Sequence, residues 1–284
     1  MLYRAGDLDL RYEVHGTGPD LLFMHGLAAD RQQAERCLST IRGFRVITVD
    51  MPGHGISPLS GRSTLAEEVG FHAYARVAGD LLQYLGVTTA YVGGISMGSG
   101  VALTLAIESP ELVSGLLLIR PAWVNGPARP HLDLLADIGH WIADGGVEVA
   151  RQRLVSDRRF VDMCSDSPMC ANGLIETIQR PHVTAAPMVL PALVDDQPYE
   201  SNSDLETCAI PALVVSSDDD PLHPRWVADR LETSLSNATA HIVPPRYLEP
   251  EDHERVVASV IQSFLDQCVE AETNRTPATT GGPT

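Results

Sequence analysis

The chain has few cysteines and no long apolar run, and each shortage excludes a class of protein. Among its 284 residues no stretch of about twenty is apolar, so the sequence predicts no membrane-spanning helix. The N-terminus lacks the charged and then apolar layout of a signal peptide, so we expect a cytoplasmic protein. The five cysteines are an odd, scattered set without zinc-ligand spacing, which favours reduced thiols and no metal site.

Basic residues are scarce relative to acidic ones. Twenty Lys and Arg against 37 Asp and Glu give a formal net charge of −17. A surface of that charge repels phosphate backbones and anionic lipid, so we expect neither a nucleic-acid partner nor a membrane partner. A small-molecule substrate remains as the expected partner, and the oligomeric state is left open.

Short apolar runs alternate with helix-compatible segments along most of the chain. The predicted strands are residues 8–14, 21–24, 45–49, 90–92, 115–119, 212–216 and 238–243. The predicted helices are residues 31–41, 63–85, 99–106, 224–236 and 256–265. Such alternation predicts an α/β fold with a mostly parallel sheet and helices on both faces.

The alternation is interrupted once, and this defines the expected domains. Residues 121–206 hold several helical stretches, many prolines and no convincing strand, so they predict a helical lid over the carboxyl edge of the sheet. Residues 1–120 and 207–268 form the predicted core. Residues 269–284 are rich in Thr, Pro and Gly, and we expect a disordered tail there.

The most informative segment is Gly93–Gly98, which contains a G-x-S-x-G around Ser96. An apolar stretch precedes it, and small helix-compatible residues follow it. A strand, a tight turn and a helix in this order are typical of a nucleophile elbow. Gly94 and Gly98 leave room for a strained turn that exposes the Ser96 hydroxyl.

Three further motifs follow predicted strands, and together with the elbow they carry a family resemblance. They are Met24–Leu27, Asp50–Ser57 and Ser217–Pro224. The set resembles the α/β-hydrolase superfamily over residues 1–120 and 207–268. The resemblance implies an eight-stranded sheet and a serine, acid and histidine triad in that chain order, with no organic cofactor and no metal. It also implies an oxyanion hole made by the backbone N–H groups of Leu27 and Met97.

The acid and the base of the implied triad have competing candidates. Asp220 is followed four residues later by proline, as the acid often is in this superfamily, and Asp219 is the alternative. Relatives usually carry a Gly-His after the last strand, which this chain lacks. His253, between that strand and the apolar face of the final helix, is our prediction for the base, and His241 is the alternative. Ser96, Asp220 and His253 are therefore the predicted catalytic residues.

The expected substrate contacts come from the loop after the second predicted strand and from the predicted lid. His25 and Gly26 belong to that loop, where His25 is expected to shape the backbone by hydrogen bonding. Trp123 and Trp141 are the candidate pocket residues of the lid. Residues 180–182 begin with Arg180. Either this segment places a cation near the entrance of the pocket, or it is solvated surface.

The resulting prediction is a serine hydrolase that cleaves an ester, lactone or thioester through an acyl-enzyme. Two alternatives stay open. The same scaffold supports carbon–carbon bond hydrolysis or non-hydrolytic chemistry, and it also supports ligand binding without catalysis.

Overall fold

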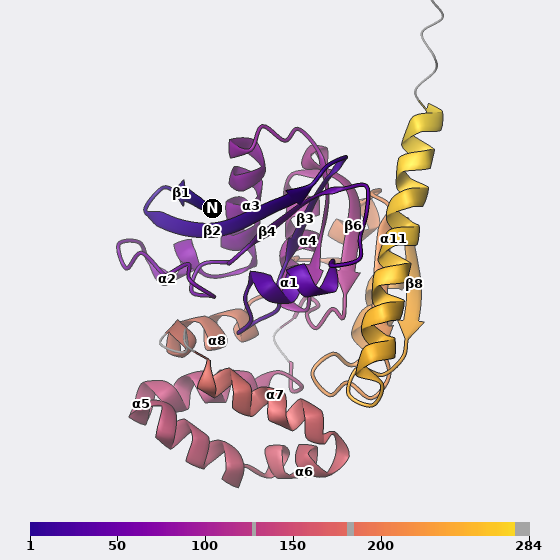
Figure 1. Ribbon diagram of the computed structural model, residues 1–284. Helices are drawn as coiled ribbons and strands as arrows, with labels where there is room; N and C mark the ends of the chain where they lie inside the picture. The colour runs from indigo at the N-terminus through magenta and orange to yellow at the C-terminus, as the bar shows by residue number, and fades with distance from the viewer. Residues whose placement is uncertain (127–128, 181–184, 276–284) are drawn as a thin grey trace, which may run out of the picture.

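A computed structural model describes residues 1–126, 129–180 and 185–275 of the chain (Figure 1). Within these residues the strands form one eight-stranded sheet in the order β1-β2-β4-β3-β5-β6-β7-β8. The strands are β1 (Leu2–Ala5), β2 (Leu8–Gly16), β3 (Asp20–Met24), β4 (Arg45–Val49), β5 (Ala90–Ile95), β6 (Val113–Ile119), β7 (Ala212–Ser217) and β8 (Ala238–Val243). The predicted fold class is confirmed.

The sheet is parallel from β4 to β8, and β1 and β2 join it antiparallel. The central strands β3 and β5 read as continuous apolar or small residues because helices bury both of their faces. All seven predicted strands are present, and β1 is an addition that pairs only with β2. The parallel arrangement brings the carboxyl ends of six strands to one edge of the sheet.

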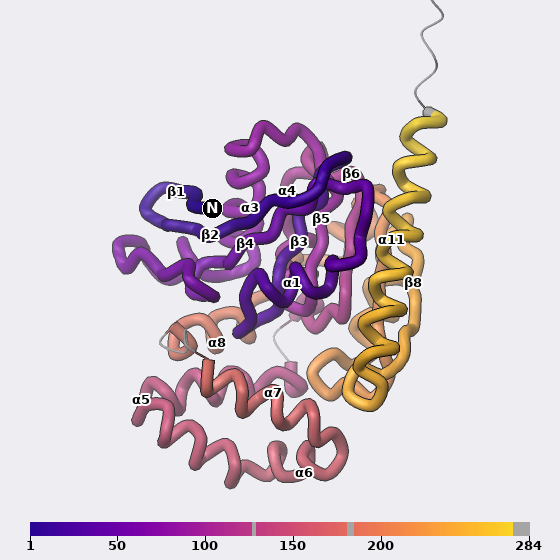
Figure 2. The backbone as a smooth tube through the Cα atoms, in the orientation of Figure 1, coloured from indigo at the N-terminus to yellow at the C-terminus, as the bar shows by residue number. Residues whose placement is uncertain are grey.

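Helices cover both faces of the sheet (Figures 1 and 2). Apolar residues of α1 and α11 pack on one face, and those of α3, α4 and α10 pack on the other. The helices of these two layers are α1 (Arg31–Cys37), α2 (Leu65–Glu68), α3 (Phe71–Tyr84), α4 (Met97–Glu108), α10 (Arg225–Ser234) and α11 (Pro250–Arg275), with a short 3-10 helix η1 at Pro110–Leu112.

The prediction of one long helix over residues 63–85 is wrong, because the segment is divided at Gly70. α2 ends at Glu68, and Gly70, with a positive φ of 141° that favours glycine, precedes the first residue of α3. The N-terminus of α3 is then satisfied from far along the chain, where the Asp196 carboxylate accepts a hydrogen bond from Phe71 N at 2.6 Å. A side chain at position 70 would also press on this carboxylate, since a Cβ there would lie 2.9 Å from Asp196 Oδ2.

Between β6 and β7 the chain forms five helices and no strand among the described residues. They are α5 (Asp133–Ser156), α6 (Arg158–Asp166), α7 (Pro168–Gln179), α8 (Ala186–Asp195) and α9 (Asn202–Thr207). Helix α5 is broken at Gly146, whose φ of 80° is not helical. Figure 1 places α5, α6, α7 and α8 together beyond the edge of the sheet toward which β6 and β8 point.

The C-terminal helix is longer than the sequence suggests. α11 continues to Arg275, so the expectation of disorder is wrong for residues 269–275. These residues add helical turns with mostly polar side chains to the end of the helix. The rest of the predicted tail, residues 276–284, lies outside the described residues. No helix of the described part combines the length and apolar composition that crossing a bilayer requires.

Candidate active site

Ser96 lies in a strained turn between β5 and α4. Its φ of 56° and ψ of −113° are costly for a residue other than glycine. A hydrogen bond of 2.9 Å from Ser96 N to Ile119 O ties the turn to β6. Both flanking glycines are required by close approach, since a Cβ at Gly94 would lie 2.5 Å from the backbone of Gly98 and a Cβ at Gly98 would overlap Met24 O. The turn has the geometry of a nucleophile elbow.

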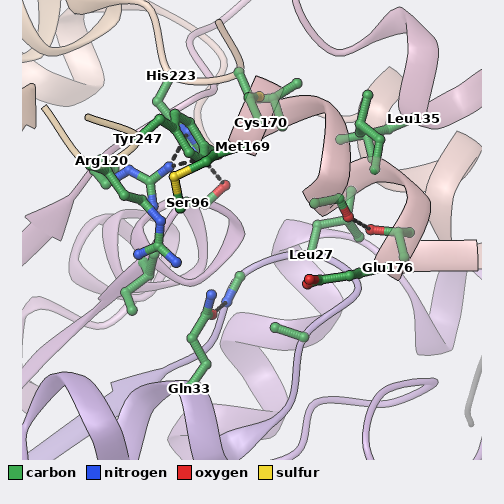
Figure 3. A pocket seen from close by; sticks show the side chains of 18 of the residues that line it. Leu27, Gln33, Ser96, Arg120, Leu135, Met169, Cys170, Glu176, His223 and Tyr247 are labelled. Carbon is green, nitrogen blue, oxygen red and sulfur yellow. Dashed lines mark hydrogen bonds between the residues drawn. The ribbon is translucent and has the colours of Figure 1, made fainter. Parts of the chain in front are cut away.

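The histidine beside Ser96 is His223. Its Nε2 lies 2.8 Å from Ser96 Oγ (Figure 3). Its Nδ1 lies 2.9 Å from Asp220 Oδ1. All three side chains are buried. The structure thus brings together Ser96 and Asp220, as expected, but through a histidine that the sequence analysis did not consider for this role.

His253 does not reach Ser96, so the expected placement of the base is wrong. Helix α11 begins at Pro250, and its first turns bury His253 with Nδ1–H donating to Pro244 O at 2.8 Å. The alternative, His241, points away as well, because it is an exposed residue of the edge strand β8. Neither of the two histidines hydrogen-bonds to Ser96.

The turn between β7 and α10 explains how His223 comes to this position. Asp219 adopts a φ of 57°, and His223 N donates to Asp220 O at 3.1 Å, so the turn folds the histidine back onto the acid. The signal in the sequence was the spacing Asp220-x-x-His223, inside a motif already singled out for its acid. The missing Gly-His after the last predicted strand was the second signal.

Arg120, which directly follows β6, is a charged group of the site that the sequence analysis missed. Its guanidinium pairs with Asp220 at 2.6 Å, and both side chains are buried. The same group lies 3.0 Å from His223 Nδ1 and 3.5 Å from Tyr247 Oη. Arg120 has a φ of 49°, an unusual conformation that turns the chain out of the sheet at this point.

The buried charges set the ionisation of the cluster. Burial lowers the pKa of His223 to about 4; the Asp220 carboxylate opposes this shift, and Arg120 adds to it. Although burial works to raise the pKa of Asp220, His223 and Arg120 hold it well below its usual range. At neutral pH the cluster therefore contains an ionised Asp220, a neutral His223 and a charged Arg120.

Asp220 and Arg120 favour opposite tautomers of the neutral His223 ring. The ionised carboxylate can only accept, so Asp220 Oδ1 requires the proton on Nδ1. The guanidinium can only donate, so Arg120 would require an unprotonated Nδ1. With the proton on Nδ1, Nε2 is free to accept from the Ser96 hydroxyl. That tautomer makes Ser96 a candidate nucleophile.

The fold is expected to lose stability in mild acid because it buries neutral histidines. Burial lowers the pKa of His253 to about 4, as it does for His223. The unfolded pKa is about 6.5, so neither group contributes above that pH. As the pH falls from about 6.5 toward about 4, these histidines bind protons in the unfolded state but stay neutral in the folded state. Each histidine then removes up to about 1.4 kcal/mol of unfolding free energy per pH unit.

Urea unfolding between pH 7.5 and 4.5 measures this loss. His253→Gln should reduce its slope, since it removes one of the histidines whose pKa is lowered by burial. A free energy of unfolding that stays constant over this range would contradict the assignment.

A cavity of about 320 Å³ opens over Ser96 (Figure 3). Leu27, Ser96 and His223 line it from the sheet side, while Leu135 of α5 and Cys170 of α7 line it from the helical segment. A neighbouring cavity of about 510 Å³ shares part of this lining. The helices between β6 and β7 therefore form one wall of the space above the hydroxyl.

The loop after β3 occupies the place expected of it. Gly26 and Leu27 line the cavity, and a Cβ at Gly26 would lie 3.5 Å from Ser96 Cβ. His25 is fully buried beneath the loop, where Nδ1–H donates to Gly26 O at 2.8 Å and Nε2 accepts from Met51 N at 3.1 Å. His25 shapes the loop as expected, but the expectation that it touches substrate is wrong. Met97 is the first residue of α4, where a backbone N–H has no partner within its helix.

The two tryptophans expected to contact substrate do not line the cavity. Trp123 is buried between layers, with Nε1–H donating to Leu193 O at 2.8 Å and its ring packed edge-on against Phe71. Trp141 is partly buried on α5 against the main apolar cluster. Both expectations are wrong because Trp123 joins α8 to α3 and Trp141 packs against the apolar cluster, and neither ring lines the cavity. Of residues 180–182, Arg180 does line the cavity, whereas 181 and 182 lie outside the described residues.

No group of three or more His, Cys, Asp or Glu side chains in the described ranges is arranged to hold a metal ion.

Comparison with known proteins agrees with this architecture. A family model described as the alpha/beta hydrolase fold matches residues 19–161. The uncharacterized hydrolase YugF of Bacillus subtilis is 22% identical over 89% of this chain and 93% of its own length. An esterase from Thermogutta terrifontis superimposes with a TM-score of 0.72 at 19% identity, covering 92% of this chain and 94% of that one.

A more identical relative aligns over a shorter stretch. The dihydrolipoyllysine-residue acetyltransferase component of the acetoin cleaving system of Cupriavidus necator is 34% identical over 125 residues. This match covers 42% of the chain but only 32% of the relative, and it indicates a shared unit rather than a shared activity.

Proposed function

The chain belongs to the alpha/beta hydrolase fold family, and from that premise we propose that it is a serine hydrolase acting on an ester, lactone or thioester of a small molecule. One observation carries the proposal. Ser96 Oγ lies 2.8 Å from His223 Nε2, and His223 Nδ1 lies 2.9 Å from Asp220 Oδ1. The three side chains lie beneath a cavity large enough for a small substrate.

In the proposed reaction Ser96 Oγ attacks the carbonyl carbon while His223 Nε2 takes the hydroxyl proton. The same nitrogen then gives this proton to the departing alcohol or thiol, which leaves an acyl-enzyme. A water molecule, deprotonated by His223, attacks the acyl carbon, and the proton passes back to Ser96 as the acid is released. Asp220 holds the imidazole in the useful tautomer and stabilises its charged form.

The negative oxygen that forms in each step needs preorganised donors. The proposed donors are the backbone N–H groups of Leu27 and Met97, which flank Ser96 from the loop after β3 and from the start of α4. The positive end of α4 supports the same charge. Helices α5 and α7 are proposed to act as a lid, since their side chains line the cavity opposite Ser96.

Labelling with a fluorophosphonate tests the proposal directly. The reagent should form one covalent adduct per chain, with the oxygen of Ser96 displacing fluoride from phosphorus, because only an activated serine reacts at useful rates. Peptide mass spectrometry should place the adduct on Ser96, and Ser96→Ala should abolish it. The exposed Ser39 provides the matched control, so Ser39→Ala should label as the unaltered protein does. Folded protein that does not react would favour a ligand-binding role.

A further inference from the structure

Two arginines above Ser96 have no hydrogen-bonded or ion-paired partner within the part of the chain that the structure describes. All twenty basic residues of the chain are arginines. Arg246, in the loop after β8, and Arg180, directly after α7, line both the cavity over Ser96 and the adjoining cavity. Among the described residues neither guanidinium forms a hydrogen bond or an ion pair. Arg120 lines the same cavities but is already neutralised by Asp220.

The lack of an ion-paired partner is energetically costly for Arg246 and Arg180 because both side chains are partly removed from water. Both side chains are half-buried, and burial lowers the pKa of each guanidinium. The carboxylates of Glu176 and Glu254 also line the cavity over Ser96, but both residues are exposed, and water screens their charge. Asp30, a half-buried residue of the adjoining cavity, attracts the charge of Arg180 but forms no ion pair with it among the described residues. A desolvated cation without an acceptor is costly, and an anion that enters the cavity removes that cost.

We propose that Arg246 and Arg180 bind a carboxylate of the substrate, so that the preferred ester, lactone or thioester is an anion. The inference rests on the proposed serine hydrolase function and names its substrate class. Planar guanidinium groups match the two oxygens of a carboxylate and can hold it with paired hydrogen bonds. Arg246 is near enough to the catalytic group to act on it electrostatically, because it contributes to the lowered pKa of His223.

A carboxylate fits the local charge better than a phosphate does. Two half-buried guanidinium groups face two exposed carboxylates at the rim, so the interior accepts one negative charge readily. A phosphate monoester carries about −1.5 to −2 charges at neutral pH, and Glu176 and Glu254 would repel the excess. The scarcity of positive charge elsewhere, with a net charge of −17, sets this cavity apart from the rest of the protein.

Matched pairs of chromogenic esters test the proposal. One pair places the charge on the acyl part, as the p-nitrophenyl hemiester of glutarate against p-nitrophenyl pentanoate. The other places it on the leaving group, as 4-acetoxybenzoate against its methyl ester. We expect kcat/KM to favour the anion at least about tenfold in one of the two pairs, as one charge-assisted bidentate contact provides. Equal or better turnover of both neutral esters would overturn the proposal.

Arginine variants connect the preference to the two side chains. In Arg246→Gln, and separately in Arg180→Gln, the anion-to-neutral ratio of kcat/KM should fall about tenfold. Arg255→Gln removes the same charge from an exposed position on α11 and should leave the ratio unchanged. If the anion-to-neutral ratio of kcat/KM stays unchanged in both cavity variants, the assignment of the two arginines is wrong. Stronger inhibition by inorganic phosphate than by glutarate would overturn the choice of a carboxylate.

Failure of this inference can be told apart from failure of the proposed function. A protein that hydrolyses neutral esters and reacts with the fluorophosphonate, yet shows no preference for anions, keeps its assignment as a serine hydrolase and loses only the carboxylate site. A protein that neither turns over any of the four esters nor labels at Ser96 refutes both.

Discussion

Replacement of His223 by alanine is expected to lower kcat for ester hydrolysis by about 10⁴-fold or more. The variant removes the group that takes the Ser96 proton at 2.8 Å, and the described structure offers no second histidine at that distance. Binding depends on the cavity walls, so KM should change far less than kcat. Initial rates with p-nitrophenyl acetate across substrate concentrations separate the two constants.

The other two histidines named by the sequence analysis are the controls for this result. His241→Ala alters an exposed residue of the edge strand and should leave kcat within about twofold. His253→Gln should cost stability, because it disturbs a buried hydrogen bond to Pro244 O, but kcat of the folded fraction should stay within about tenfold. A loss of activity in His253→Gln with full activity in His223→Ala would restore the original assignment.

Arg120→Leu is expected to lower the free energy of unfolding by about 3–5 kcal/mol. The substitution leaves Asp220 buried with only His223 to balance its charge, and an ion pair broken on one side in the interior costs this much. It should also move the acid limb of the pH profile of kcat/KM upward. Arg120 holds down the pKa of His223, and without it the imidazole gains its proton at a higher pH.

A double variant separates the loss of the pair from general damage. In Arg120→Leu with Asp220→Asn no buried charge remains unbalanced, so part of the lost unfolding free energy should return. Urea unfolding of the four proteins gives the coupling between the two residues. Strictly additive losses, together with an unmoved acid limb in the single variant Arg120→Leu, would show that the guanidinium has no such role.

The features that the sequence predicted correctly are local ones. The central strands were recognisable because burial on both faces demands continuous apolar residues, as in β3 and β5. The elbow was recognisable because the glycines around Ser96 have no sterically possible replacement at Gly94 and Gly98. Asp220 was singled out because the acid in this superfamily is often followed by proline four residues later, and the structure places its carboxylate 2.9 Å from His223.

The features that it missed depend on contacts between distant segments. The break at Gly70 is stabilised by Asp196, which lies 125 residues from the helix that it caps. The position of His253 was inferred from its place in the chain, but the path of residues 244–249 was not available from periodicity or spacing. Arg120 reads as the end of a strand, and only the fold shows that it meets Asp220, 100 residues later.

The placement of acid and base on one short turn has a consequence for how this enzyme could be altered. In the proposed mechanism the distance between Asp220 and His223 is set by four consecutive residues and not by the packing of two separate loops. The loop after β8 then contributes no group that transfers the proton, although Arg246 still acts on the pKa of His223. Substitutions and insertions around Arg246 should be tolerated without loss of turnover chemistry, which makes this loop the natural place to redesign substrate choice.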